Sequence, residues 1–148
     1  MKNNIVKLQS SVNASFEDML KVVLIEHDEI LRDILSRMLR KLGHAVFEFD
    51  DGDSIIDKVN SISPDLIITD ILLPNRDGVK LISSLRRDYP ELPIIAISES
   101  RKVGNIDYLE LAINFGANEA IEKPILYSKF IKTVEDVVSL SKQGWVSC

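Results

Sequence analysis

The chain has 148 residues, a length that suits one domain whose core needs no disulfide or metal staples. Its net charge of −5 argues against nonspecific binding to nucleic acid, and no apolar run reaches the ~18 residues of a membrane span. The single cysteine, Cys148, excludes an internal disulfide and fits a reducing setting. We therefore expect a cytoplasmic protein that binds neither nucleic acid nor membrane.

Residues 1–20 are polar and weakly patterned, so we expect an N-terminal extension there, either a loose tail or a short helix. Alternating strand and helix patterns then run from Lys21 to Leu140, which sets a domain over residues 21–140. Residues 141–148 are expected to form a C-terminal tail.

The apolar run at 21–25 is typical of a strand buried on both faces. Apolar residues spaced by three and four predict a helix from Ile30 to Leu42, and Gly43 is placed to end it. Alternating strands and helices with short connections predict one parallel sheet with helices on both faces. The remaining elements are expected as strands at 44–49, 67–70, 94–97 and 118–121, and as helices at 55–62, 79–87, 106–115 and 127–140.

The helix expected at 106–115 has more apolar residues than one buried face needs. We expect four of them to face the core: Ile106, Leu109, Ala112 and Ile113. The others form a second stripe, which is either covered by the preceding loop or exposed as a contact surface: Tyr108, Leu111 and Phe115.

Polar side chains follow four of the predicted strands, and the carboxyl ends of parallel strands meet at one edge of a sheet. These side chains are Glu26 with His27 and Asp28, then Asp70, Ser98 and Lys123. Carboxylates held together repel, so a hard cation such as Mg²⁺ would compensate them, and a lysine can hold a phosphoryl oxygen. The set predicts phosphoryl transfer, with Asp70 as the nucleophile.

The same residues, taken in order, resemble the receiver domain of response regulators, the CheY-like family of two-component signalling. The resemblance implies an α/β, flavodoxin-like fold: a doubly wound, five-stranded parallel sheet of order 2-1-3-4-5 with helices on both faces. It is carried by the acidic cluster at Glu26, the stretch Pro64 to Asp70, Pro74 with Asp77-Gly78, Ser98, and Gly116-Ala117 leading to Lys123-Pro124.

The resemblance also implies roles for individual residues. Asp70 would be the phosphoacceptor, Ser98 the switch hydroxyl, and Lys123 the phosphate contact, with a cis peptide to Pro124. Mg²⁺ would be held by Glu26, Asp70 and the Leu72 carbonyl. The implied partners are a histidine kinase or phosphotransfer protein, a downstream protein, and a second copy through the fourth helix, fifth strand and fifth helix. Such a domain signals and is not an enzyme.

Three positions depart from the family pattern. His27 stands at the position of the second acid, a metal ligand, although imidazole suits Mg²⁺ poorly. Glu99 follows Ser98 where a very small residue is usual, and Ala120 replaces an aromatic residue. We expect a stand-alone receiver without an output domain; the alternative is a pseudo-receiver scaffold, left unphosphorylated because of His27 and Glu99.

Two further alternatives are less favoured by the residues. A flavin- or nucleotide-binding module would need a Gly-rich phosphate loop after the first strand, where this chain has Glu26 to Glu29. An aspartyl-phosphate hydrolase would need a second acid two residues after Asp70, where this chain has Leu72.

Overall fold

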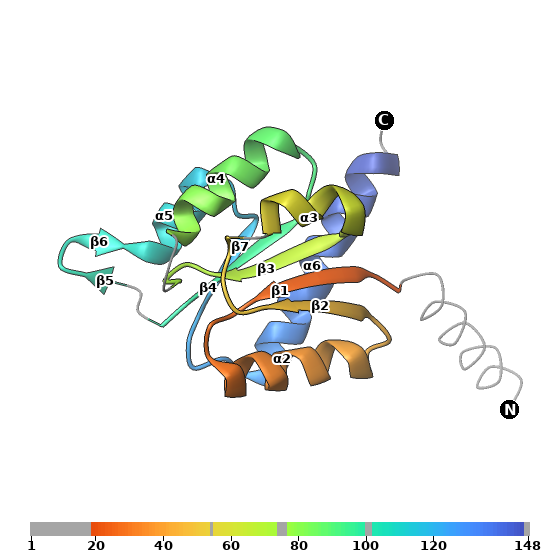
Figure 1. Cartoon of the computed structure of the whole chain (residues 1–148), viewed down its shortest axis with the longest axis horizontal. Coiled ribbons are helices and arrows are strands. Elements are labelled where there is room, and N and C mark those ends of the chain that lie inside the picture. The colour runs from red at the N-terminus through yellow and green to blue at the C-terminus, as the bar shows by residue number, and fades with distance from the viewer. Residues whose placement is uncertain (1–18, 54, 74–76, 100–101, 147–148) are drawn as a thin grey trace, which may run out of the picture.

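Figure 1 shows the computed structural model of the chain, which describes residues 19–53, 55–73, 77–99 and 102–146. The extension expected over residues 1–20 falls almost wholly on residues 1–18, outside this described part. The turn residue Pro74 and residues 147–148 also lie outside it.

Five parallel strands form the central sheet in the spatial order β2-β1-β3-β4-β7. Counted as strands of this sheet alone, that is the order 2-1-3-4-5, so the predicted flavodoxin-like fold is confirmed. β3 and β4 are buried at every residue, as expected for apolar runs covered on both faces. The bounds are β1 Lys21–Ile25, β2 Ala45–Phe49, β3 Leu66–Asp70, β4 Ile94–Ser98 and β7 Glu119–Glu122.

Helices cover both faces of the sheet, with α2 and α6 on one side and α3, α4 and α5 on the other (Figure 1). Their bounds are α2 Glu29–Lys41, α3 Ile55–Ile62, α4 Gly78–Asp88, α5 Tyr108–Phe115 and α6 Tyr127–Val146. Because α6 continues to Val146, the tail expected over 141–148 is wrong for residues 141–146. Within the described ranges, none of the helices has the length and hydropathy needed to cross a bilayer.

Side chains of each strand alternate between the two faces of the sheet, which divides the core in two. In β1, Val23 and Ile25 join the cluster under α3, α4 and α5, whereas Val22 and Leu24 join the cluster under α2 and α6. The second cluster also includes three residues that the helical spacing of α6 places inward: Phe130, Val134 and Val137.

A short antiparallel hairpin, β5 (Lys102–Val103) paired with β6 (Ile106–Asp107), precedes α5 and was not predicted. Gly104 adopts a φ of 62° in the turn between them, a conformation that favours glycine. The Asp107 carboxylate then accepts hydrogen bonds from the amides of Leu109 (3.1 Å) and Glu110 (3.2 Å). The helix expected from Ile106 therefore begins at Tyr108, after this cap.

The face that α5 buries also differs from the prediction. Ala112 is buried as expected, but Tyr108 and Leu111 pack against the core, whereas Ile106 and Ile113 are exposed at 49% and 42%. In a short helix that is apolar on most sides, spacing alone does not fix which side turns inward. The cap and the hairpin before the helix set its rotation instead.

Arg86 in α4 forms hydrogen bonds at the edge of the sheet opposite the candidate site, where β7 begins. Its guanidinium donates to the Gly116 carbonyl from Nε (3.0 Å) and Nη2 (2.8 Å), and to Asn118 Oδ1 at 2.9 Å. It also donates to the carbonyls of Tyr89 (3.2 Å) and Pro90 (2.9 Å). Burial lowers the pKa of Arg86, though an arginine stays charged, and the contacts tie the end of α5 to the end of α4.

Candidate functional site

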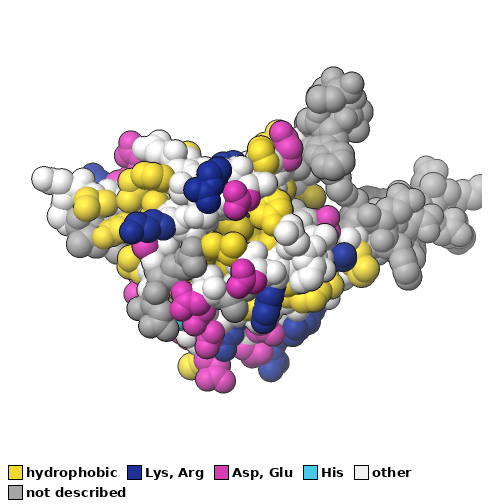
Figure 2. Space-filling view, turned by 45° about the horizontal axis from the view of Figure 1, so that its top comes forward, with side chains coloured by type: hydrophobic (Ala, Val, Ile, Leu, Met, Phe, Trp, Pro, Cys, Tyr) yellow, Lys and Arg dark blue, Asp and Glu magenta, His cyan; other side chains and the backbone are white. Residues whose placement is uncertain are grey.

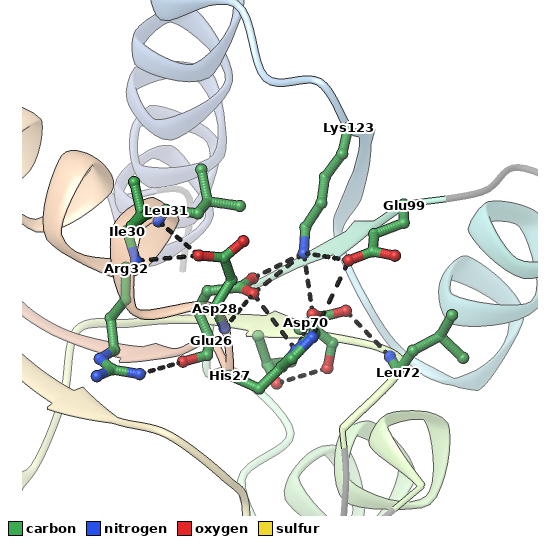
Figure 3. Close-up of polar contacts among 11 residues, drawn as sticks. Glu26, His27, Asp28, Ile30, Leu31, Arg32, Asp70, Leu72, Glu99 and Lys123 are labelled. Carbon is green, nitrogen blue, oxygen red and sulfur yellow. Dashed lines mark hydrogen bonds and ion pairs between the residues drawn. The ribbon is translucent and has the colours of Figure 1, made fainter.

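Two buried carboxylates and one lysine meet at the carboxyl edge of the sheet (Figure 3). Asp70 ends β3, Glu26 follows β1, and Lys123 follows β7. Lys123 Nζ lies 3.0 Å from Asp70 Oδ2, and 3.1 Å and 3.0 Å from Glu26 Oε1 and Oε2. Neither carboxylate is exposed, and the lysine side chain is 10% exposed. The sequence prediction that these three groups converge is confirmed.

Strand register brings these residues together although they are far apart in sequence. Ile25 pairs with Thr69, and Asp70 pairs with Ile97, so the carboxyl ends of three neighbouring strands are offset from one another by only one residue at each step. Ser98 ends β4 with its side chain buried, and its carbonyl accepts a 2.7 Å hydrogen bond from the Lys123 amide. The peptide between Lys123 and Pro124 is cis, as the resemblance implied.

Backbone contacts hold Glu26 in place. The Asp28 amide donates to Glu26 Oε1 at 3.0 Å, and Arg32 Nη1 donates to the Glu26 carbonyl at 2.7 Å. The Asp28 carboxylate accepts from the amides of Ile30 (2.9 Å) and Leu31 (3.2 Å), so it caps α2. The sequence gives no sign of the Arg32 contact, because Arg32 looks like an ordinary residue on the outer face of a helix.

Asp70 is fixed from its own strand and from the start of α4. Its Oδ1 accepts a 3.0 Å hydrogen bond from the Leu72 amide, and its carbonyl accepts one of 3.0 Å from the Thr69 hydroxyl. Gly78 lies against the backbone just after it, where a Cβ would stand 2.5 Å from the Ile71 oxygen and 2.6 Å from the Asp70 oxygen. Asp77-Gly78 was predicted as a turn, and glycine is also required here by this close approach.

His27 and Glu99 complete the site. His27 Nδ1 lies 2.9 Å from Asp70 Oδ2 and 3.4 Å from Glu26 Oε1. The Glu99 carboxylate, whose side chain is 58% exposed, lies 4.0 Å from His27 Nε2 and 3.9 Å from Lys123 Nζ. Two of the three departures from the family pattern, His27 and Glu99, therefore lie beside the phosphoacceptor and the lysine that pairs with it.

The charges in this cluster affect one another. Burial, followed by repulsion from Asp70, raises the pKa of Glu26 above its ordinary value. Burial alone would lower the pKa of Lys123, but hydrogen bonds and attraction from Asp70 and Glu26 outweigh it, so the pKa is raised. Lys123 is therefore a firmly protonated cation that partly neutralises two acids.

The cluster has ligands for a divalent cation. Glu26, His27 and Asp70 each offer one ligand atom, and these atoms lie within 4.8 Å of one another. Glu26 Oε2 and His27 Nδ1 have no hydrogen-bond partner among the described residues, although Glu26 Oε2 forms an ion pair with Lys123 Nζ at 3.0 Å. Two carboxylates suit Mg²⁺, whereas an imidazole nitrogen is a ligand that Mg²⁺ seldom takes. The Leu72 carbonyl stays a predicted ligand, and the switch role of Ser98 stays a prediction.

Residues 22–135 match the model of the response regulator receiver domain, so the chain belongs to this family. The family resemblance is thereby confirmed, and it places the chain in two-component signalling. Receiver domains are signalling domains rather than enzymes in the usual sense.

Solved structures agree with this assignment. The receiver domain of NtrX from Brucella abortus is 30% identical with a TM-score of 0.73, over 80% of this chain and 98% of that one. A longer NtrX structure from Brucella abortus is 29% identical, with a TM-score of 0.79. The match covers 87% of the present chain but only 29% of that NtrX chain. A CheY-like receiver from Methanospirillum hungatei, 17% identical with a TM-score of 0.78, over 86% of this chain and 99% of that one, shares the fold.

Proposed function

We propose that this receiver accepts a phosphoryl group on Asp70 from the phosphohistidine of a histidine kinase or phosphotransfer protein, with a divalent cation bound beside it. The observation that supports this most directly is the 3.0 Å contact between Lys123 Nζ and Asp70 Oδ2 in a buried acidic cluster. That the chain works as a stand-alone, cytoplasmic receiver stays a prediction from the sequence.

The chemistry is a displacement at phosphorus. A carboxylate oxygen of Asp70 forms a bond to phosphorus while the phosphorus–nitrogen bond of the donor breaks, and the donor imidazole keeps the bonding electrons. Lys123 neutralises a phosphoryl oxygen, and the Leu72 amide at 3.0 Å keeps Asp70 oriented. A bound dication would supply further neutralisation of the phosphoryl and carboxylate oxygens.

Mg²⁺ is the ion that the family implies, and Glu26 and Asp70 would hold it. His27 stands where a second acid is usual, so the site carries one negative charge fewer. Hard-cation affinity rises with the charge of the ligands, so Mg²⁺ binding should be weaker than in a typical receiver and should improve in His27→Asp.

The proposal is tested by incubating the protein with acetyl phosphate or phosphoramidate and a divalent cation, read by intact mass. We expect one added phosphoryl group in the wild type and none in Asp70→Asn. Asp136→Asn removes an exposed carboxylate on α6 and should behave like the wild type. No added mass with any cation, including in His27→Asp, would refute the proposal.

The pseudo-receiver alternative also has a specific observation in its favour. Glu99 brings a carboxylate to 3.9 Å from Lys123 Nζ, and His27 lies 2.9 Å from Asp70, so both departures stand where an incoming phosphoryl group must pass. If this alternative holds, His27→Asp combined with Glu99→Ala should accept a phosphoryl group although the wild type does not.

We further propose that the phosphorylated domain acts through a protein surface formed by α5, β7 and α6, including self-association. Several large hydrophobic side chains are exposed there, and Figure 2 shows hydrophobic side chains at the end of the molecule that carries the hairpin and α5. A beryllofluoride-activated NtrC4 receiver domain is described as a dimer. Sedimentation with and without beryllium fluoride tests this, and Phe115→Asp should weaken any dimer that forms.

A further inference from the structure

His27 has two different surroundings, one at each ring nitrogen (Figure 3). Nδ1 faces the acids, 2.9 Å from Asp70 Oδ2 and 3.4 Å from Glu26 Oε1. Nε2 faces the other way, 4.0 Å from Glu99 Oε1. The ring therefore lies between the buried acid pair and an exposed carboxylate.

The contact between His27 and Asp70 is close but is not a hydrogen bond. Nδ1 has no hydrogen-bond partner among the residues that the structure describes, although Asp70 Oδ2 lies only 2.9 Å away. A neutral imidazole carries its proton on one nitrogen and a lone pair on the other. A cation bound beside the two acids would take the Nδ1 lone pair and leave the proton on Nε2, as in a metal-binding histidine whose other nitrogen faces a carboxylate.

We infer that the cation site of this receiver takes a nitrogen-binding transition-metal dication, such as Ni²⁺, Fe²⁺ or Zn²⁺, in preference to Mg²⁺, with His27 Nδ1 as ligand and Glu99 as its outer carboxylate. The use of this site in signalling rests on the proposed function, whereas the preference among metals rests on the donor atoms alone. One oxygen each from Glu26 and Asp70 completes the protein ligand set.

Competition from Lys123 makes the nitrogen ligand more important. Its Nζ already lies 3.0 Å from Asp70 Oδ2 and 3.0 Å from Glu26 Oε2, so a metal ion must bind carboxylates that are paired with an ammonium group. Mg²⁺ binding is favoured only by the negative charge that Lys123 leaves uncompensated on the two carboxylates, because an imidazole ligand adds little to the affinity for Mg²⁺. A transition metal gains the metal–nitrogen bond as well, and imidazole suits it.

The first test compares Ni²⁺ with Mg²⁺, which have similar sizes, by calorimetric titration of the untagged chain. The ratio of Ni²⁺ to Mg²⁺ affinity should fall by about tenfold or more in His27→Asp, with Mg²⁺ binding more tightly and Ni²⁺ less tightly. His44 is the other of the two histidines, and it accepts a hydrogen bond from the Leu20 amide. His44→Gln is the matched control and should keep the wild-type ratio, because His44 is outside the cluster.

The second test observes the nitrogen directly. In a Zn²⁺ titration of histidine-labelled protein, the Nδ1 resonance of His27 should shift at saturation, and the resonances of His44 should stay in place. Glu99→Gln should weaken Zn²⁺ binding by several-fold in the wild type and have no such effect in His27→Asp, because the carboxylate acts through the imidazole.

The two tests separate this inference from the proposed function when acetyl phosphate labelling is run in parallel with each cation. If Ni²⁺ binds through His27 but Asp70 is never labelled, the metal preference stands and the proposed function fails. If Asp70 is labelled with Mg²⁺ while His27→Asp leaves the affinity ratio unchanged and Nδ1 does not shift, the proposed function stands and the metal preference is overturned.

Discussion

Glu99 Oε1 lies 3.9 Å from Lys123 Nζ, so a third, exposed carboxylate stands beside the lysine that pairs with Asp70 and Glu26. An incoming phosphoryl donor is anionic and meets this charge before it reaches Asp70. At saturating metal, Glu99→Gln should accept phosphate from acetyl phosphate about twofold to fivefold faster, the size expected of an exposed charge interaction. The rates are read by intact mass over time.

Two controls, a change of ionic strength and a matched charge-removing variant, accompany the comparison of Glu99→Gln with the wild type. Raising the ionic strength should narrow the difference between Glu99→Gln and the wild type, because exposed charges are screened. Glu135→Gln removes the same charge from an exposed position on α6 and should leave the rate unchanged. A slower Glu99→Gln would mean that Glu99 assists the reaction.

Leu72 should lengthen the lifetime of the phosphorylated state. Its side chain is apolar and 40% exposed, and its amide is bonded to Asp70, so it stands next to the phosphoacceptor. Hydrolysis needs a water molecule held in line with the phosphoryl group, and leucine cannot hold one by a hydrogen bond. Leu72→Asn should therefore lose the added phosphoryl mass faster than the wild type. Equal decay in the two proteins would contradict this prediction.

Gly78 should be required for stability because of the space it leaves. Gly78→Ala would place a Cβ 2.5 Å from the Ile71 oxygen, against backbone that cannot rotate away. We expect a loss of about 1–3 kcal/mol in the free energy of unfolding, measured with urea. Gly104 has no atom within 4 Å of an added Cβ and a φ of +62°, a conformation that asparagine tolerates. Gly104→Asn should therefore lower the free energy of unfolding much less than Gly78→Ala does.

Glu26 should destabilise the metal-free protein at neutral and alkaline pH. Its pKa is raised by burial and by Asp70, so the folded state keeps this proton at pH values at which the unfolded state has lost it. The penalty is absent below the ordinary value of 4.5 and grows as the pH rises through the folded-state pKa. Glu26→Gln should therefore raise Tm at pH 8 by about 2–4 °C, which corresponds to ~1 kcal/mol.

The pH series distinguishes this cause from a general effect of removing charge. The increase in Tm caused by Glu26→Gln should become smaller as the pH is lowered toward 4.5. Glu119→Gln, at an exposed position of β7, should show no such trend. A gain that is the same at every pH would contradict ionisation of Glu26 as the cause.

Phosphorylation should change the conformation or dynamics of the hairpin and α5. Glu99 leads from the site toward β5, and Ala120 replaces the aromatic residue that usually relays the signal, so we predict coupling through residues 102–115. Hydrogen exchange there should change with a beryllium fluoride mimic, while the edge strand 45–49 should not respond. Ile113→Asp, at an exposed position of α5, should weaken self-association and spare labelling of Asp70. An unresponsive hairpin would rule out this route.

The central sheet could be predicted because each apolar run is short, ends abruptly and carries its polar residue at the same edge. The same logic placed Glu26, Asp70 and Lys123 together before any geometry was known. The hairpin was missed although Gly104-Asn105 between β-branched residues is a two-residue turn signal, because Ile106 also fits the helical spacing that follows.

Other features depend on packing that no local pattern encodes. Arg32 looks like a solvated helix residue until the fold brings it within 2.7 Å of the Glu26 carbonyl. The inward rotation of Tyr108 and Leu111 follows the Asp107 cap and the hairpin, so of the two alternatives left open for the second stripe, exposure does not hold at those two positions. Leu111, which packs on the core, is for that reason a poor site for a surface variant.

The Arg86 contacts have a mechanical consequence for α5. Gly116, at the end of the helix, is held by Arg86, whose Nε and Nη2 donate to the Gly116 carbonyl at 3.0 Å and 2.8 Å. The beginning of the helix follows the small hairpin, and Tyr108 and Leu111 contact the core there by side-chain packing. Because packed side chains can slide whereas the Arg86 hydrogen bonds hold Gly116, we expect a displacement at the site to rotate α5 about Gly116, with the largest movement near Tyr108.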